Sequence, residues 1–113
     1  FIMTIQYKSE SFDLTTTNLT TVLTISTSAV AIVKTVQASH MDASNVDADL
    51  YLKKSGGSNV EVGHAQLNKS MTNMIVNTLN LEAGDVIKMQ ADTANEITGF
   101  VSYALINREN ENG

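Results

Sequence analysis

Threonine is concentrated in residues 15–27, where it occupies seven positions, and proline is absent from the whole chain. Threonine, valine and isoleucine branch at Cβ, which stiffens the side chain, disfavours helix and suits the pleated surface of a sheet. These residues and serine together outnumber the helix formers Ala, Leu, Glu and Arg. The hydrophobic period agrees, because Ala48, Leu50 and Leu52 alternate with polar residues as they would in a half-buried strand. We therefore expect an all-β fold.

About eight segments have the composition of strands. They are residues 5–14, 20–25, 29–38, 48–53, 59–62, 71–81 (as one strand or two short pieces), 86–91 and 97–106. Short strands at this spacing, separated by turn residues such as Gly56-Gly57 and Ala83-Gly84-Asp85, predict an antiparallel sandwich or a jelly-roll-like fold. A length of 113 residues favours a single domain over residues 1–113, with flexible ends at residues 1–4 and 107–113.

Period-2 patterns also predict which side chains form the core. We expect five residues on inner faces of strands to be buried: Leu50, Leu52, Val86, Ile32 and Val101. Residues 29–33 are apolar at every position, which is typical of a central strand covered on both faces. The end segments 1–9 and 107–113, of which the second is polar, are expected to be flexible and to become ordered on binding a neighbour.

Composition excludes several classes of protein. The formal net charge is −5 and Arg108 is the one arginine, whereas nucleic-acid-binding modules carry basic stripes and arginine forks. The chain has no cysteine, so it can form neither disulfides nor thiolate zinc sites. Residues 29–33 are the longest apolar run, far short of the roughly 20 residues of a membrane-spanning helix. No secretory signal is recognisable, and we expect no nucleic-acid or membrane partner.

His40 and His64 are the candidates for acid–base catalysis, which needs a histidine oriented by a nearby carboxylate. Asp42 lies two residues after His40, and Glu61 lies three residues before His64. No Gly-x-Ser-x-Gly motif accompanies them. We predict that both histidines are polar residues at strand ends and that the protein is not an enzyme. An enzyme would need a cleft that joins one histidine to a carboxylate and to a group that stabilises an electrophile.

The acidic residues and the aromatic rings are the candidates for metal and sugar sites. Asp42, Asp47 and Asp49, with Asn45 among them, could supply oxygen ligands to calcium, but the glycine and glutamate of an EF-hand loop are missing. Asp47 and Asp49 would share one face of a strand, which favours an exposed acidic strip. Sugar sites stack aromatic rings, and the chain has three Tyr, three Phe and no Trp, with Tyr51 and Tyr103 as candidates outside the core. We predict no catalytic, cofactor-binding or metal-binding residue.

Four segments carry a resemblance to a known family. They are residues 18–23 (NLTTVL), 31–38 (AIVKTVQA), 49–52 (DLYL) and 79–91, and the last contains Leu81-Glu82-Ala83-Gly84-Asp85-Val86-Ile87, a Leu-x-Ala-Gly-Asp-x-Ile turn and strand. Over residues 20–105 the sequence resembles small β-sandwich virion proteins of tailed bacteriophages, including marine and cyanobacterial phages. Such turns also occur in other jelly rolls, so the motifs specify the fold more than the place on the particle.

The resemblance implies a virion structural protein, assembled in the host cytoplasm, with no catalytic residue. Its first expectation is a capsid decoration (cement) protein, a homo-oligomer with a trimer favoured, whose partner is the major capsid protein or another virion protein. A neck or tail component is the close alternative. The fold would equally serve a receptor- or carbohydrate-binding module at a fibre tip, which would need exposed aromatic rings or an acidic calcium cluster in its loops.

Overall fold

The computed structural model describes residues 4–40, 45–67, 71–76 and 78–107, and within them it contains nine strands and no helix. The all-β prediction is confirmed, and residues 71–81 form two strands. No helix long and apolar enough to cross a membrane is present among these residues. The strands are β1 (Thr4–Leu14), β2 (Thr20–Thr24), β3 (Ala29–His40), β4 (Val46–Lys53), β5 (Asn59–Leu67), β6 (Met71–Val76), β7 (Leu79–Leu81), β8 (Val86–Ala91) and β9 (Ile97–Asn107).

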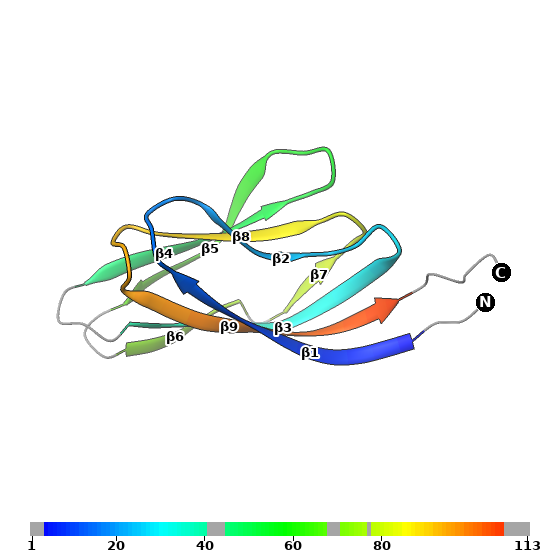
Figure 1. Cartoon of the computed structure of the whole chain (residues 1–113), viewed down its shortest axis with the longest axis horizontal. Coiled ribbons are helices and arrows are strands. Elements are labelled where there is room, and N and C mark those ends of the chain that lie inside the picture. The colour runs from blue at the N-terminus through cyan, green and yellow to red at the C-terminus, as the bar shows by residue number, and fades with distance from the viewer. Residues whose placement is uncertain (1–3, 41–44, 68–70, 77, 108–113) are drawn as a thin grey trace.

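The strands form two antiparallel sheets that pack face to face (Figure 1). The first sheet has the order β1-β9-β3-β6, with β7 also paired to β3, and the second has the order β2-β8-β4-β5. Strands pair from the outside of the sequence inwards: β1 with β9, β2 with β8, β3 with β7 and β6, and β4 with β5. A long antiparallel ribbon is thus rolled up and closed by the β3–β9 and β4–β8 pairs, which is the jelly-roll arrangement.

The core lies between the sheets and consists of alternate side chains from both. Leu50 and Val101 are fully buried, as predicted, whereas Leu52 is only partly buried. The prediction for Val86 is wrong, because β8 turns Ile87, Met89 and Ala91 inwards and leaves Val86 half-buried. Val86 and Ile87 are adjacent apolar residues, so the sequence period alone left either of them free to face the core.

The expectation that both faces of residues 29–33 are covered is also wrong. β3 is central in its sheet, but among residues 29–33 it buries Ala29, Ala31 and Val33 alone, while Ile32 on the other face is 37% exposed. A two-layer sandwich covers one face of each sheet, and no described element lies over the outer face at Ile32. The apolar outer face therefore belongs to the surface.

The β4–β5 hairpin extends beyond the sandwich. Its end, at the loop of residues 54–58, rises away from the two sheets in Figure 1. The β4–β5 register shifts between Leu50 and Tyr51, and a bulge of this kind bends and twists a strand pair. Val60 and Val62 alternate with polar residues, but both are exposed because this part of the hairpin extends beyond the core.

The expectation of a flexible segment over residues 1–9 is wrong for Thr4 to Ser9. These residues belong to β1 and pair in register with β9, from Thr4 opposite Asn107 to Ser9 opposite Ser102. Asn107, expected in the other flexible end, likewise belongs to a strand, β9. The remaining parts of the two ends, residues 1–3 and 108–113, lie outside the described residues, as does Asp42. Their flexibility stays a prediction.

Candidate functional site

His40 is fully buried at the end of β3. Its Nδ1 lies 3.1 Å from the carbonyl oxygen of Glu96, and this contact is a hydrogen bond when Nδ1 carries the proton. The carboxylate of Glu96 lies 3.8 Å from the same nitrogen. Glu96 is 56 residues away in the sequence, so local spacing, which suggested Asp42, could not identify it. A histidine enclosed in this way connects β3 to the segment before β9.

The prediction that both histidines lie at strand ends is wrong for His64, which lies inside β5, on the outer face of the second sheet, opposite Asp49 of β4. Its Nδ1 is 2.5 Å from Oδ1 of Asp49. Glu61 completes a group whose three ligand atoms lie within 4.8 Å of one another, so a divalent cation could in principle meet one nitrogen and two oxygens here. The sequence predicted Glu61 as the neighbour of His64, and it offered Asp49 as a possible calcium ligand or as part of an acidic strip, without pairing it to His64.

The charge state of this group follows from its neighbours. The hydrogen bond to Asp49 raises the pKa of His64, burial opposes that rise, and the charges of Asp49, Asp47 and Glu61 add to it. Burial, followed by the charges of Glu61 and Asp49, raises the pKa of Tyr51. Protonated His64 thus balances one carboxylate of an otherwise acidic surface.

The predicted strip of Asp47 and Asp49 is present on one face of β4, where both side chains are half-buried. Asp47 and Asp92 join β4 to the end of β8: the Asp92 backbone N–H donates to the Asp47 carbonyl at 3.1 Å, and the Asp47 N–H donates to Oδ1 of Asp92 at 3.1 Å. These two contacts hold the start of β4 against the residue that follows β8.

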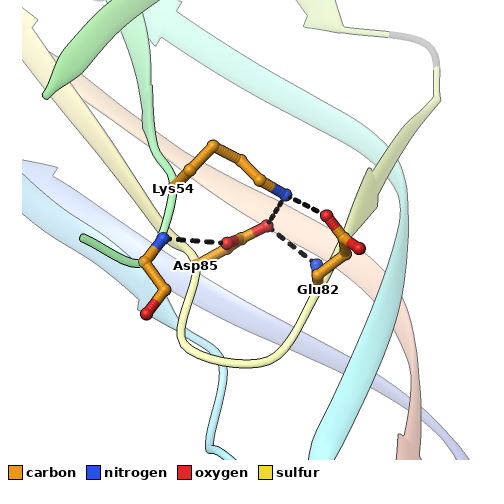
Figure 2. Close-up of polar contacts among 4 residues, drawn as sticks. Lys54, Glu82 and Asp85 are labelled. Carbon is orange, nitrogen blue, oxygen red and sulfur yellow. Dashed lines mark hydrogen bonds and ion pairs between the residues drawn. The ribbon is translucent and has the colours of Figure 1, made fainter. Parts of the chain in front are cut away.

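The Leu-x-Ala-Gly-Asp segment forms the turn between β7 and β8, and its aspartate is the most enclosed acidic residue described (Figure 2). The Asp85 side chain is 1% exposed and accepts three hydrogen bonds: from Lys54 Nζ at 2.5 Å, from the Glu82 backbone N–H at 2.8 Å and from the Ser55 N–H at 3.3 Å. Lys54 Nζ also donates to Oε1 of Glu82 at 2.6 Å. Gly84 has a φ of +82°, which glycine adopts without steric cost.

Burial by itself would raise the pKa of Asp85, but the hydrogen bonds from Lys54, Glu82 and Ser55 outweigh it and hold that pKa below its usual value. The hydrogen bonds that Lys54 donates to the carboxylates of Asp85 and Glu82 raise the pKa of Lys54, and burial opposes that rise. The turn also pairs with the end of β2, because the Ile25 N–H donates to the Asp85 carbonyl at 2.9 Å and the Gly84 N–H donates to the Ile25 carbonyl at 3.0 Å. The motif therefore joins three parts of the fold: the β7–β8 turn, the end of β4 and the end of β2.

Neither histidine lines a described cavity. One cavity of about 300 Å³ lies between β1, β2 and β9 and is bordered by Lys8, Glu10, Leu23 and Tyr103. Another, of about 430 Å³, lies beside the turn of Glu82 and Asp85. His40 belongs to the first sheet and His64 to the second. The cleft that an enzyme would need around either histidine is not found among the described residues.

The aromatic candidates occupy strands. Tyr103 is buried and its hydroxyl donates to Oε1 of Glu10 at 3.4 Å, while Tyr51 is half-buried in β4. The most exposed ring is Tyr7 of β1, at 81%, and Phe100 of β9 is also exposed. These rings lie on the outer face of the first sheet, where sequence reasoning placed no candidate, although the alternation of Ile5 and Tyr7 with polar residues indicated such a face.

Comparison with known proteins finds neighbours in structure alone. No family model matches the chain, and no curated protein matches it in sequence. A chain in the acid-stable capsid of a Helicobacter pylori bacteriophage is similar with a TM-score of 0.59 and 8% identity, over 93% of this chain and 89% of that one. A chain from Bacillus endospore appendages, described as disulfide-linked pili, gives a TM-score of 0.56 and 9% identity over 94% and 88%.

A third neighbour comes from the VP2 subviral particle of infectious bursal disease virus, with a TM-score of 0.51 and 8% identity over 97% of this chain and 34% of that one. At these identities the similarity shows the fold. The chain is thus a small all-β sandwich of a kind that also occurs in virus particles and in a bacterial surface fibre.

Proposed function

We propose that this chain is a structural protein of a virion. The observation that carries the proposal is the match to the bacteriophage capsid chain, which spans nearly the whole length of both proteins. The similarity extends over the whole sandwich, so the proposed role rests on the surfaces of that sandwich. The described residues agree, because their buried polar groups connect strands and neither histidine lines a cavity.

Within the virion, the proposed role is that of a capsid decoration (cement) protein of a tailed bacteriophage, which stabilises the shell by binding the major capsid protein or another virion protein. A small domain present in many copies gains strength from repeated weak contacts on a symmetric particle. The protein would be a homo-oligomer, with the trimer that the family resemblance implies, and would need no cofactor. It would have no catalytic activity and would be located in the virion.

Two alternatives remain within the same fold. A neck or tail component would use the same surfaces at another place on the particle. A receptor- or carbohydrate-binding module at a fibre tip would need aromatic rings in loops, whereas the exposed rings of the described residues, Tyr7 and Phe100, lie in strands. The resemblance to an endospore pilus subunit supports an assembling role in general, but disulfide linkage is not open to a chain without cysteine.

Antibody labelling of particles tests the proposal. Particles from cells that carry this protein's gene are purified, labelled with gold-conjugated antibody and imaged by negative stain. Label over the shell is the expected result, and label at the neck, tail or fibre tip would replace the cement role with one of the alternatives. Purified particles that carry no copy of the protein would overturn the virion assignment itself. A glycan array then tests the fibre-tip module, and binding above background would favour that module.

A further inference from the structure

β1 is an edge strand of unusual length. It spans 11 residues from Thr4 to Leu14 and pairs with β9 on one side, and no described strand lies along its other side. Residues 5–11 are all exposed. The free edge of a strand presents unpaired N–H and C=O groups that can pair with another chain, and most strands are only about 5–6 residues long. The free edge of β1 can therefore form more backbone hydrogen bonds with an added strand than the edge of a strand of ordinary length.

When two copies of β1 pair with each other, a single register pairs the strand over its whole length. Two copies of a strand related by a two-fold axis pair antiparallel, so the numbers of any two opposing residues have a constant sum. That sum is even, because only alternate residues point their backbone groups to the free edge. With Ser9 on the axis the sum is 18, Thr4 lies opposite Leu14 of the partner subunit, and all 11 residues of β1 are paired.

Charge selects the same register. Lys8 and Glu10 share the face of β1 that looks towards β2, since both border the cavity between β1, β2 and β9. With Ser9 on the axis, each Lys8 lies opposite Glu10 of the partner subunit. The neighbouring allowed registers place Lys8 or Glu10 on the axis, so that it faces its own copy, and like charges directly opposite each other destabilise a strand pair. Charged residues that point inward from an edge also discourage pairing with strands that lack matching charges.

We propose that two copies of this chain associate through β1 in an antiparallel two-fold contact centred on Ser9, which extends the first sheet across the dimer. The occupant of the edge is thus a second copy, chosen by full-length register and by the Lys8–Glu10 complementarity. The contact belongs to the isolated protein and does not depend on any virion partner, so it can hold whether or not the proposed function does. It can also coexist with a separate three-fold contact.

A charge-reversal series tests the pairing. Lys8→Glu and Glu10→Lys each place like charges opposite one another, and each is expected to weaken self-association by about tenfold or more, since two symmetric pairs change sign together. The double variant restores opposite pairs and should regain association, and an equimolar mixture of the two single variants should form a heterodimer. Lys34→Glu makes the same charge change at an exposed position of β3 and serves as the matched control. The readout is mass by sedimentation velocity across a concentration series.

A cysteine scan tests the position of the axis. The chain contains no cysteine, so a substitution introduces a single thiol. Ser9→Cys places two thiols opposite each other, at a Cα separation of about 4.5–5.5 Å that suits a disulfide, and should give a covalent dimer under mild oxidation. Ser11→Cys, also exposed, lies opposite Tyr7 of the partner subunit and about 13 Å along the strand from its own copy, so it should stay monomeric under the same conditions.

Each result decides the proposal. Preferential cross-linking of Ser9→Cys, together with loss and recovery of association in the charge series, supports it. A parent protein that sediments as a monomer at every concentration up to the millimolar range would overturn it. So would equal cross-linking at positions 9 and 11, or association that Lys8→Glu and Lys34→Glu change alike. A trimer whose mass none of the β1 variants alters would show that self-association uses another surface.

Discussion

Two ion pairs in this protein have the same separation, 2.5 Å, and very different surroundings. Asp85 is 1% exposed and receives two backbone N–H groups besides Lys54, so it joins the β7–β8 turn to the end of β4. Asp49 and His64 are 27% and 53% exposed and lie opposite each other on strands that already pair through their backbones. The contribution of such a pair to stability depends on its burial and on its backbone hydrogen bonds, and the distance between the charged atoms does not reveal either of these.

A core substitution beside the exposed pair sets the scale for this comparison. Leu50 is adjacent to Asp49 in β4 but faces inward and is fully buried. Leu50→Ala should lower the free energy of unfolding by about 2–5 kcal/mol, because it removes packed methyl groups and leaves a cavity. Guanidinium unfolding measures the loss, with Ile32→Ala, an exposed position, as a control expected to lose less. An unchanged midpoint for Leu50→Ala would show that the β4 register described above is wrong.

Asp85→Ala should have the next largest effect, a loss of about 2–4 kcal/mol. The substitution leaves Lys54 without its buried partner and the N–H groups of Glu82 and Ser55 without an acceptor. Asp92→Ala is the matched control, since exposed Asp92 accepts a single backbone N–H from Asp47, and its loss should be clearly smaller. Equal losses for the two variants would mean that enclosure adds nothing to the Asp85 contacts.

The pH dependence of stability should separate the two pairs by sign. The folded state holds the pKa of Asp85 below the ordinary 3.8, so its contribution is present above that value and is lost as the pH falls through the lowered pKa. Asp85→Asn should therefore flatten the acid limb of the unfolding free energy measured between pH 2 and 5. An acid limb as steep as that of the parent would assign the effect to other carboxylates.

The exposed pair should give the smallest effect, with the opposite sign. The pKa of His64 is raised above 6.5, so its contribution is complete below 6.5 and disappears as the pH rises through the raised pKa. His64→Gln should destabilise slightly at pH 5.5 and leave the unfolding midpoint unchanged at pH 9. A larger loss at pH 9 than at pH 5.5 would show that His64 acts through packing instead of charge.

The strands were predictable because their chemistry is local. Cβ-branched residues, alternation and glycine turns identify most strands within one or two residues, although β5 extends five residues beyond the predicted 59–62. Leu50 and Val101 follow from period 2. Which side chains of an apolar run face the core depends on the rest of the fold, and for this reason the predicted burial of Ile32 and Val86 is wrong. A run of five apolar residues fits either face until the opposite sheet is positioned.

The contacts at the site depend on register and on long-range pairing. Asp49 meets His64 because β4 and β5 pair with a shift between Leu50 and Tyr51, and no spacing rule predicts that shift. Lys54 and Asp85 are 31 residues apart, and the turn motif gave no sign of which cation would meet its aspartate. The Leu-x-Ala-Gly-Asp turn was interpreted as a feature of the fold, and the structure gives the physical reason: the Asp85 carboxylate accepts the hydrogen bonds that hold the turn to the end of β4.

The first and last described strands are partners, with Thr4 opposite Asn107, so β1 begins beside the residue at which β9 ends (Figure 1). A rolled ribbon of this kind is close to being a ring. A short linker from one end to the other would close it, and new ends could then be opened in the exposed loop of residues 54–58, at the far end of the β4–β5 hairpin. The order in which the strands follow one another along the chain is thus separable from the way they lie in space.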